Sequence, residues 1–448
     1  MKSYDVVIIG GGPAGYTTAI TLKRLNPERS VALIRREEKV LIPCAIPYLF
    51  HSIDSIDKNI LPDAPLHKLG IDLIIDEVKS VDLDNRIVKT SKSGEIGFKK
   101  LVLATGSRPT KLGLKGEELK NVYYIIKDYN YMKEMIESIR SATNIVIIGG
   151  GFVGVEIADE LAKAGKNVTI VEILPHCLLK NFDEDFAILA EEELRKHGVN
   201  IKTNTSVVSI EGSGKVEKVK LSTGEELPAD VVIISVGVKP NTDLAKAMGL
   251  KLGPLGGILV DNCRRTSNPI VFAVGDCIER PDIITGRPIM VQLASAATTD
   301  ARIVALNLSA NGAPCRYAGS IGVFSTKIGD TVFACAGITE NRAKKEEIDY
   351  VVGVGEAVDR HPGVLAGAKK IKLKLLISKV SREIIGAQVA GGPSVAEFIN
   401  MLGVLIQHRV RLLDILTLQV ATHPWLTPSP VAYTLYAAAL DAYAKLRK

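Results

Sequence analysis

The chain has 448 residues, enough for roughly three domain-sized units, and its 46% hydrophobic and 24% charged residues are typical of a globular protein with large cores. The net charge of +6 comes from 56 basic and 50 acidic residues that are scattered along the chain, which gives no reason to expect a nucleic-acid partner. The apolar stretch 401–421 carries Arg409, Arg411 and Asp414, so we expect no membrane-spanning segment. The N-terminus has no basic leader with a cleavage site and predicts no signal peptide.

The six cysteines are widely separated, with no C-x-x-C pair and no His/Cys spacing suited to zinc. We therefore expect no metal site. The pattern is also not that of a secreted disulfide framework, which favours the reducing cytoplasm as the location.

The first expected element is a short β-branched strand over 4–9, followed by a glycine-rich turn, a helical stretch and a second apolar strand over 31–34. The turn has the pattern G-x-G-x-x-G, whose glycines allow a pyrophosphate to approach the backbone at a helix N-terminus. The residues of this turn that we expect to bind a dinucleotide are Gly10, Gly12, Pro13, Ala14 and Gly15.

The end of that second strand departs from the usual pattern, because Arg35 stands where a carboxylate would accept the ribose hydrogen bonds. Either Glu37 or Glu38 takes this role with a shifted turn, or the Arg35–Arg36 face holds the adenosine end. Shortly afterwards Cys44 lies between two prolines, Pro43 and Pro47. A helix beginning there would lower the pKa of the thiol and favour the thiolate, although most cysteines are simply small buried hydrophobes.

A second strand–turn–helix–strand segment repeats the first one. A strand over 144–148 enters a turn that contains Gly149, Gly151 and Gly154, and another strand follows over 168–171. One such motif is weak, but two in the same context are strong support for dinucleotide binding. Glu172 ends the second strand, where a carboxylate accepts ribose hydroxyls and repels a 2′-phosphate, so we expect NADH rather than NADPH.

The remaining segments alternate in hydrophobicity. Residues 77–103 and 202–236 are expected to form antiparallel strands, 319–389 is strand-rich, and 394–407 and 431–448 are helical. The order suggests a first domain that is interrupted by a second, then completed, and then followed by a C-terminal domain.

Four further motifs join the two glycine turns. They are Leu103–Pro109, Val236–Asn241, Val271–Asp276 and Ala336–Glu340. Together they resemble the pyridine nucleotide–disulfide oxidoreductases over nearly the whole chain. The resemblance implies an α/β fold with two Rossmann-like dinucleotide-binding domains, one inserted in the other, and a C-terminal α+β dimerisation domain. The domains implied are FAD-binding over 1–112 and 241–318, NAD-binding over 113–240, and dimerisation over 319–448.

The resemblance also implies roles for individual residues. FAD would be held by the first glycine turn with Thr105, Gly106 and Asp276, and NADH by the second turn with Glu172. Glu156 matches a glutamate near the contact of nicotinamide and flavin, and Gly237 belongs to a cofactor-binding motif. The family forms homodimers with active sites at the interface.

Cys44 is followed five residues later by Leu49, whereas two-cysteine members of the family have C-x-x-x-x-C. The chain is therefore similar to the single-cysteine branch, which contains coenzyme A disulfide reductases, NADH oxidases, NADH peroxidases and polysulfide reductases. This similarity implies that Cys44 is the redox-active thiol.

Further positions distinguish the members of that branch. Pro13 stands where oxidases and peroxidases carry a histidine, and proline can neither donate a hydrogen bond nor transfer a proton. Lys23 and Arg24 fall where coenzyme A disulfide reductases bind the CoA phosphates, or they are a solvated helix end. The tyrosine pair of those enzymes is absent around Gly363–Leu365.

The C-terminal segment 422–427 resembles the interface motif whose histidine, here His423, acts as acid and base across the dimer. The glutamate that normally follows five residues later is replaced by Pro428, and a structural role for His423 is the alternative.

The function that these observations favour is the reduction of a small disulfide or polysulfide by NADH through FAD and Cys44. Two alternatives stay open: an NADH oxidase that reduces oxygen, and an electron-transfer flavoprotein that reduces a redox partner protein. A non-catalytic FAD sensor is disfavoured by the two intact nucleotide motifs.

Overall fold

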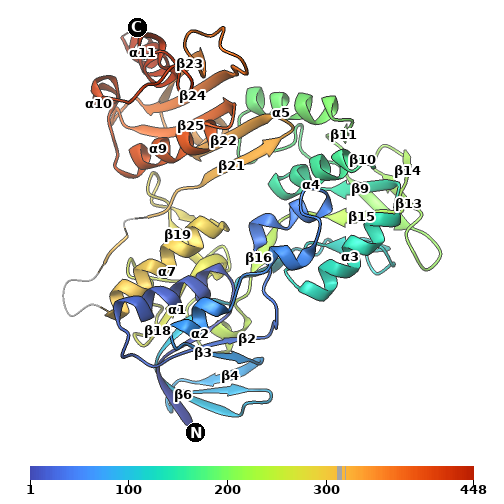
Figure 1. The fold of residues 1–448 in the computed structure, drawn as a ribbon, viewed down its shortest axis with the longest axis vertical. Helices are drawn as coiled ribbons and strands as arrows, with labels where there is room; N and C mark the ends of the chain where they lie inside the picture. The colour runs from blue at the N-terminus through green and yellow to red at the C-terminus, as the bar shows by residue number, and fades with distance from the viewer. Residues whose placement is uncertain (310–314, 318, 448) are drawn as a thin grey trace. The chain divides into compact units, whose positions relative to one another are not determined.

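The computed structural model describes residues 1–309, 315–317 and 319–447 (Figure 1). These residues form two compact units, and each unit joins segments that are distant in the sequence. The first unit contains 1–112, 124–141 and 237–320, and the second contains 113–123, 142–236 and 321–448. The glycine turn at Gly149 and the C-terminal segment thus share one unit, while 124–141 joins the unit of the first glycine turn. The division into three functional domains stays a prediction.

The first unit is built on a seven-stranded sheet with the order β3-β2-β1-β6-β5-β4, in which β18 pairs with β6. Its strands are β1 (Lys2–Ile9), β2 (Val31–Arg35), β3 (Asp72–Ile75), β4 (Val78–Asp82), β5 (Ile87–Thr90), β6 (Glu95–Leu103) and β18 (Val271–Ala273). The pairs made by β1 and β18 are parallel, and those of β4 with β5 and of β5 with β6 are antiparallel. The antiparallel strands expected over 77–103 are confirmed for β4, β5 and the first half of β6. The second half of β6 instead lies between β1 and β18 and pairs with both in parallel.

The helices of this unit cover the sheet and carry its connections. They are α1 (Pro13–Leu25), α2 (Ala64–Lys68), α3 (Tyr129–Ser141), α6 (Asp243–Ala247) and α7 (Ala294–Ser309), with short 3₁₀ turns η1 (Pro43–Ala45), η2 (Pro47–Phe50), η3 (Ile56–Asn59) and η4 (Gly275–Cys277). Short strands complete the unit, namely β7 (Ser107–Pro109), β16 (Val238–Pro240), β17 (Ile258–Leu259), β19 (Ile278–Pro281) and β20 (Pro288–Ile289).

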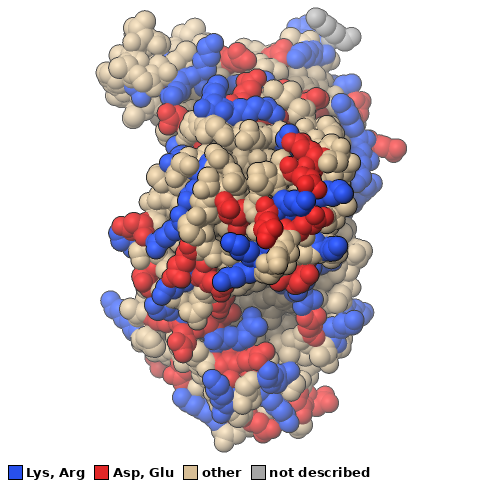
Figure 2. Space-filling view, turned by 90° about the vertical axis from the view of Figure 1, so that its right-hand side faces the viewer, with Lys and Arg blue, Asp and Glu red and all other residues tan. Residues whose placement is uncertain are grey.

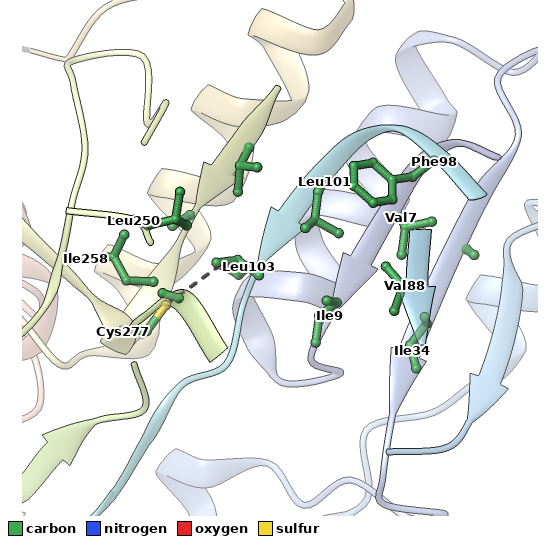
Figure 3. Close-up of a cluster of buried hydrophobic side chains, with 14 of the residues drawn as sticks. Val7, Ile9, Ile34, Val88, Phe98, Leu101, Leu103, Leu250, Ile258 and Cys277 are labelled. Atoms are coloured by element: carbon green, nitrogen blue, oxygen red, sulfur yellow. Dashed lines mark hydrogen bonds between the residues drawn. The ribbon is translucent and has the colours of Figure 1, made fainter. Parts of the chain in front are cut away.

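The core of the first unit lies on both faces of its sheet, because alternate residues of each strand point to opposite sides. Figure 3 shows one of these faces, where Val7, Ile9 and Leu103 pack with Phe98 and Cys277. Val6 and Ile8 point to the other face and pack with residues of α1 and α7. Burial on both faces explains why the strands read as continuous apolar runs in the sequence.

The second unit begins with a sheet of the order β11-β10-β9-β15-β8, in which β11, β10, β9 and β15 pair in parallel. Its elements are β8 (Val122–Tyr124), β9 (Asn144–Ile148), α4 (Phe152–Lys163), β10 (Asn167–Val171), α5 (Glu184–Lys196), β11 (Asn200–Lys202) and β15 (Val231–Ile234). An antiparallel sheet of β12 (Val207–Glu211), β13 (Lys218–Leu221) and β14 (Glu226–Pro228) precedes β15. The antiparallel prediction for 202–236 is wrong for β15, which pairs parallel with β9 and is fully buried.

The C-terminal part of this unit is an antiparallel sheet with the order β21-β22-β25-β24-β23 (Figure 1). The strands are β21 (Val323–Ile328), β22 (Thr331–Gly337), β23 (Tyr350–Val358), β24 (Lys370–Ser378) and β25 (Ile384–Gly391). The helices are α8 (Glu340–Lys345), α9 (Val395–Gln407), α10 (Leu412–Thr417) and α11 (Thr434–Leu446), with a 3₁₀ turn η5 (Pro430–Ala432). The strand-rich and helical segments expected from the sequence are confirmed, as is the α/β fold class.

Among the described residues, no helix is long and apolar enough to cross a membrane. The face shown in Figure 2 carries basic and acidic side chains interspersed with one another.

Candidate active site

The first glycine turn is shaped by close packing on one side and open space on the other. A Cβ atom on Gly10, whose φ is +114°, would lie 2.1 Å from the carbonyl oxygen of Ala104. A Cβ on Gly15 would lie 1.9 Å from the carbonyl oxygen of Gly10, whereas a Cβ on Gly12 would meet nothing within 4 Å. No side chain caps the N-terminus of α1, so its backbone N–H groups are available to a phosphate. The turn therefore fits a dinucleotide pyrophosphate over Gly12.

The second glycine turn has the same geometry. Cβ atoms on Gly149 and Gly154 would lie 2.4 Å and 2.0 Å from backbone oxygens, and a Cβ on Gly151 would again meet nothing within 4 Å. No side chain caps α4 at Gly151. The structure thus places a second cradle of the same design in the other unit.

Glu172 lies at the end of β10 and is buried beside this second turn. Its carboxylate accepts hydrogen bonds from the backbone N–H of Gly150, at 2.6 Å, and of Leu174, at 2.8 Å. A carboxylate has about four acceptor positions, so capacity remains for ribose hydroxyls. This geometry fits the predicted preference for NADH.

Arg35 occupies the matching place at the end of β2, and its side chain is almost fully buried. Its guanidinium donates to both carboxylate oxygens of Asp63 at 2.7 Å and to the carbonyl oxygens of Glu37 and Glu38. The aliphatic part of Arg35 lies against Gly11, where a Cβ would come within 2.4 Å of it. Arg35 therefore supports the glycine turn and fastens the Glu37–Glu38 segment and Asp63, while Arg36 is exposed.

Asp276 lies in η4, directly after β18 and beside the start of α1. Its Oδ2 accepts a hydrogen bond from Ser107 Oγ at 2.8 Å, and Lys127 Nζ lies 3.4 Å away. Lys127 was not found in the sequence analysis, because it belongs to a segment with no motif of its own. A cation next to an aspartate that is expected to contact FAD is well placed to contact a phosphate, so we add Lys127 to the candidate FAD residues.

Thr105 and Gly106 follow β6 and are held by Asn241. Thr105 Oγ1 donates to the Asn241 carbonyl at 2.6 Å, and the Asn241 side chain donates back to the Thr105 carbonyl at 3.0 Å. Gly237 also joins this region, because its carbonyl accepts from the Thr110 N–H at 3.0 Å. These bonds join the two segments of the first unit next to Asp276, whose partner Ser107 is part of the same loop.

Cys44 lies in η1, in the same unit as the first glycine turn. Its thiol is exposed, and none of the six cysteines, all of them in described positions, is in a disulfide. The expected helix is only a three-residue 3₁₀ turn, because Pro47 has no N–H to continue the bonding. The contribution of a helix dipole to the thiol is correspondingly small. Buried Asn59 fixes the turn by bonding to both the N–H and the carbonyl of Ile42.

The other cysteines have different surroundings. Cys177, Cys263, Cys277 and Cys335 are buried, and Cys315 is half-buried. Burial raises the pKa of the Cys277 thiol, which points at the Leu103 carbonyl within the core shown in Figure 3. Burial also keeps Cys177 and Cys335 protonated by raising their pKa. Cys44 is the only one of the six cysteines, all of them in the described part of the chain, that is exposed.

Glu156 lies in α4, just past the second glycine turn. Burial raises the pKa of its carboxyl to about 7, and a hydrogen bond of 2.8 Å from Thr326 Oγ1 on β21 partly offsets this effect. Phe152 and Phe324 stack beside the pair, with ring centroids 5.1 Å apart. A carboxyl that titrates near neutral pH beside a nucleotide cradle is a candidate functional group.

The titration of Glu156 predicts a specific dependence of stability on pH. Because its pKa is raised in the folded protein, the folded state binds the proton more tightly, so stability falls as the pH rises from about 4.5 to about 7. Glu156→Gln is expected to be more stable than the wild type at pH 8, by up to about 3 kcal/mol, and equal to it at pH 4.5. Thermal unfolding at both pH values measures this difference. Exposed Glu192→Gln is the control, and an equal gain in both variants would contradict the assignment.

His423 lies in an exposed turn between α10 and α11. Its Nδ1 accepts the Trp425 N–H at 3.3 Å, so the neutral ring carries its proton on Nε2. The Thr427 hydroxyl closes the turn by accepting the His423 N–H at 2.9 Å. These contacts orient the ring where the usual glutamate is replaced by Pro428.

His361 contacts the same turn of the chain. It was not identified in the sequence analysis. Its backbone N–H donates to the Pro424 carbonyl at 2.9 Å, and its Nδ1 lies 3.0 Å from the Thr427 carbonyl. Arg360 lies over the Trp425 ring at 5.6 Å. The stretch that lacks tyrosines thus carries a histidine and an arginine against the His423 turn.

The two basic residues at the end of α1, Lys23 and Arg24, differ in their surroundings. Lys23 Nζ donates to the carbonyl oxygens of Pro27 and Arg29, so its ammonium is engaged by the loop that follows α1. Arg24 is exposed and is the member of the pair that can meet a ligand. Within the described ranges, no group of three His, Cys, Asp or Glu side chains could hold a metal ion.

Comparison with known proteins identifies the family. Residues 4–299 match the family described as pyridine nucleotide-disulphide oxidoreductase, and residues 323–432 match the dimerisation domain of that family. A protein from Pyrococcus horikoshii named NAD(P)H coenzyme A polysulfide/persulfide reductase is 34% identical over 394 residues, covering 86% of this chain and 87% of the relative. An NADH oxidase from Methanocaldococcus jannaschii is 31% identical over 452 residues, covering 98% and 99%.

A solved structure of an NAD-dependent persulfide reductase from A. fulgidus superposes with a TM-score of 0.92 at 31% identity, covering 98% of this chain and 83% of the other. These matches confirm the resemblance inferred from the motifs, together with FAD and NADH as the cofactors and oxidoreduction as the activity. The chain belongs to the pyridine nucleotide-disulphide oxidoreductases.

Proposed function

We propose that this oxidoreductase uses NADH to reduce the sulfur–sulfur bond of a small polysulfide, persulfide or disulfide, with Cys44 as its single redox-active thiol. The observation that carries the proposal is the placement of Cys44, an exposed thiol held by a rigid turn in the unit of the first nucleotide cradle. No second cysteine follows at the spacing of a disulfide pair, because residue 49 is leucine. The relatives named as persulfide reductases support the choice of substrate class.

The thiol would act as a nucleophile. The Cys44 thiolate attacks one sulfur of the substrate, forms a mixed disulfide, and releases the other sulfur as a thiolate or hydrosulfide. The mixed disulfide is then cleaved by the electron pair of NADH, which restores the Cys44 thiolate and releases the second thiol. One NADH and one proton are consumed for each sulfur–sulfur bond. FAD, when bound, supplies the transfer of this electron pair from the nicotinamide to sulfur.

We assign binding roles to the residues around the two cradles. Gly10, Gly12 and Gly15, with Pro13, Ala14, Thr105, Gly106, Asp276 and Lys127, would hold FAD, and Gly149, Gly151 and Gly154 with Glu172 would hold NADH. Arg35 supports the first cradle from beneath, as its bonds to Asp63 and to the Glu37–Glu38 segment suggest. Glu156 would lie near the nicotinamide, where its carboxyl can hold or release a proton near neutral pH.

The dimerisation domain supports a homodimer, and we propose that the turn of His423 reaches the active site of the partner subunit. Because His423 Nδ1 accepts the Trp425 N–H, Nε2 is the ring nitrogen left to face a substrate, and in the imidazolium form it would donate the proton to a leaving thiolate. We also propose a cytoplasmic location, in which reduced cysteines are the normal state.

The choice of acceptor is tested by consumption of NADH in the absence of oxygen. Polysulfide and CoA disulfide are offered separately, and the thiol or sulfide formed is quantified; a parallel assay offers oxygen alone. We expect one sulfur–sulfur bond reduced per NADH, at a rate well above that with oxygen. Faster turnover with oxygen would establish an NADH oxidase instead, and turnover with only a protein carrier would establish an electron-transfer flavoprotein.

The role of His361 gives a separate prediction. His361→Phe keeps a ring of similar size but removes the Nδ1 contact with the Thr427 carbonyl, so the His423 turn loosens. We expect kcat for sulfur reduction to fall by up to about a hundredfold, the loss that displacing an acid–base group by about 1 Å can cause, and its pH profile to change while KM for NADH is retained. His408→Phe is the control, because His408 is exposed in the same unit. A kcat and pH profile like the wild type would exclude this role.

A further inference from the structure

A cluster of three charged side chains lies within the first unit beneath the loop of Asp276. Arg264, Arg280 and Asp300 are 0%, 1% and 1% exposed. Arg264 Nε donates to Asp300 Oδ1 at 2.8 Å, and Arg280 Nη2 donates to Asp300 Oδ2. Removing charges from water is costly, and a buried ion pair by itself is a weak source of stability. The value of this cluster must therefore lie in the part of the chain that its hydrogen bonds fix.

Two of the three side chains hold one residue of the loop. Asp300 Oδ2 accepts the Gly275 N–H at 3.1 Å, and Arg280 Nη2 donates to the Gly275 carbonyl at 3.0 Å. Arg280 is itself fixed by a bond of 3.1 Å from Nη1 to the Val291 carbonyl. Both polar groups of the Gly275 backbone are thus clamped by the ion pair.

Gly275 needs such a clamp because of its conformation. Its φ is +83°, and a Cβ there would lie 2.9 Å from the Cβ of Ala14 at the start of α1. Glycine fits this position, but it has the greatest freedom to leave the conformation. Since Gly275 directly precedes Asp276, the direction of the Asp276 side chain depends on the clamped peptide.

Arg264 provides an internal comparison. It is as deeply buried as Arg280 and bonds to the same carboxylate, but its Nη1 and Nη2 have no hydrogen-bond partner among the described residues and it makes no bond to Gly275. It lies instead over the Tyr317 ring at 5.1 Å. The two arginines therefore differ in their contact with the loop rather than in burial or charge.

We propose that Arg280 and Asp300 are positioning residues for FAD, which clamp Gly275 so that Asp276 is presented to the cofactor. This inference rests on the proposed role of Asp276 as a FAD ligand. Neither residue touches the cofactor; both act through the backbone of Gly275.

The test is the affinity of the full-length apoprotein for FAD, measured by quenching of flavin fluorescence on titration. Arg280→Met is expected to raise the Kd at least about tenfold, the effect of losing charge-assisted hydrogen bonds, whereas Arg264→Met stays within about threefold of the wild type. The absorption bands of bound flavin are expected to shift in Arg280→Met and to be unchanged in Arg264→Met. Thermal unfolding of both apoproteins shows whether the two substitutions damage the fold equally.

If either methionine variant does not fold, the pair Arg280→Lys and Arg264→Lys replaces it. A lysine at 280 keeps the charge but cannot reach Asp300, Gly275 and Val291 together, so the same order of Kd values is expected. Equal Kd values for the two positions, or a wild-type Kd in the Arg280 variants, would overturn the inference.

Asp276→Asn separates this inference from the proposal on which it rests. If Asp276→Asn leaves the Kd unchanged, the assignment of Asp276 fails. If Asp276→Asn weakens FAD binding but Arg280→Met does not, only the clamp fails.

Discussion

Cys44→Ser is expected to abolish sulfur-dependent oxidation of NADH, with a fall of about a thousandfold or more in kcat. A serine hydroxyl stays protonated at neutral pH and cannot form the mixed disulfide through which the electrons reach the substrate. FAD content and the KM for NADH are expected to be retained, since Cys44 belongs to neither nucleotide cradle. The measurement is anaerobic NADH consumption with polysulfide, together with the flavin content of the purified variant.

The matched control for this substitution is Cys315→Ser. Cys315 is half-buried in the same unit, so solvent-borne reagents reach it more readily than the four buried cysteines. It is expected to keep wild-type activity with every acceptor. Oxidation of NADH by oxygen is expected to continue in Cys44→Ser, because it needs only bound flavin. Sulfur reduction that persisted undiminished in Cys44→Ser would refute the mechanism.

Lys374→Met is expected to destabilise the second unit by about 3 kcal/mol, the range for breaking a buried ion pair by removing one partner. The Lys374 side chain is 8% exposed on β24 and its Nζ lies within 3.5 Å of Asp183, Asp185 and Glu340. Asp183 is also bonded to Gln388 of β25, so this cluster joins α5, which packs on the sheet of β9 and β10, to the C-terminal sheet. Without the Lys374 ammonium, the carboxylates of Asp183, Asp185 and Glu340 repel one another, and Asp183 is buried without its cation.

Urea unfolding followed by fluorescence measures this effect, because the single tryptophan, Trp425, lies in the same unit. Lys372→Met is the control. Lys372 is the neighbouring lysine of β24 on the same face, but its side chain is 27% exposed, and among the described residues its ion pair is with Asp185 alone. A partly exposed pair contributes about 1 kcal/mol or less. Equal losses for the two lysines would show that burial of the Asp183 cluster is unimportant.

The parts of the fold that could be predicted from sequence are those encoded by neighbouring residues. The two glycine turns predict strand, turn and helix because each glycine answers a local steric demand, such as the contact of Gly15 with the Gly10 carbonyl. The direction of β15 could not be predicted in this way. Val231–Ile234 follows a set of antiparallel strands, and only its pairing with β9, distant in the sequence, makes it parallel.

Prediction of the candidate site was limited in the same way, by contacts between residues that are distant in the sequence. Cys44, Glu172 and Asp276 were found because each stands at a fixed distance from a motif. Lys127 and His361 were missed because their significance arises from contacts with residues far along the chain. The role of Arg35 also depended on a distant partner, since Asp63 lies 28 residues away. Periodicity and spacing carry no signal for such contacts.

The proposed mechanism depends most directly on the covalent chemistry of Cys44. We would incubate the enzyme, without oxygen, with a small disulfide of known mass and locate the adduct by mass spectrometry of the digested protein. We expect a single mixed disulfide on the peptide that contains Cys44, and we expect it to disappear when NADH is added. An adduct on another cysteine, or an adduct on Cys44 that NADH does not remove, would contradict the mechanism.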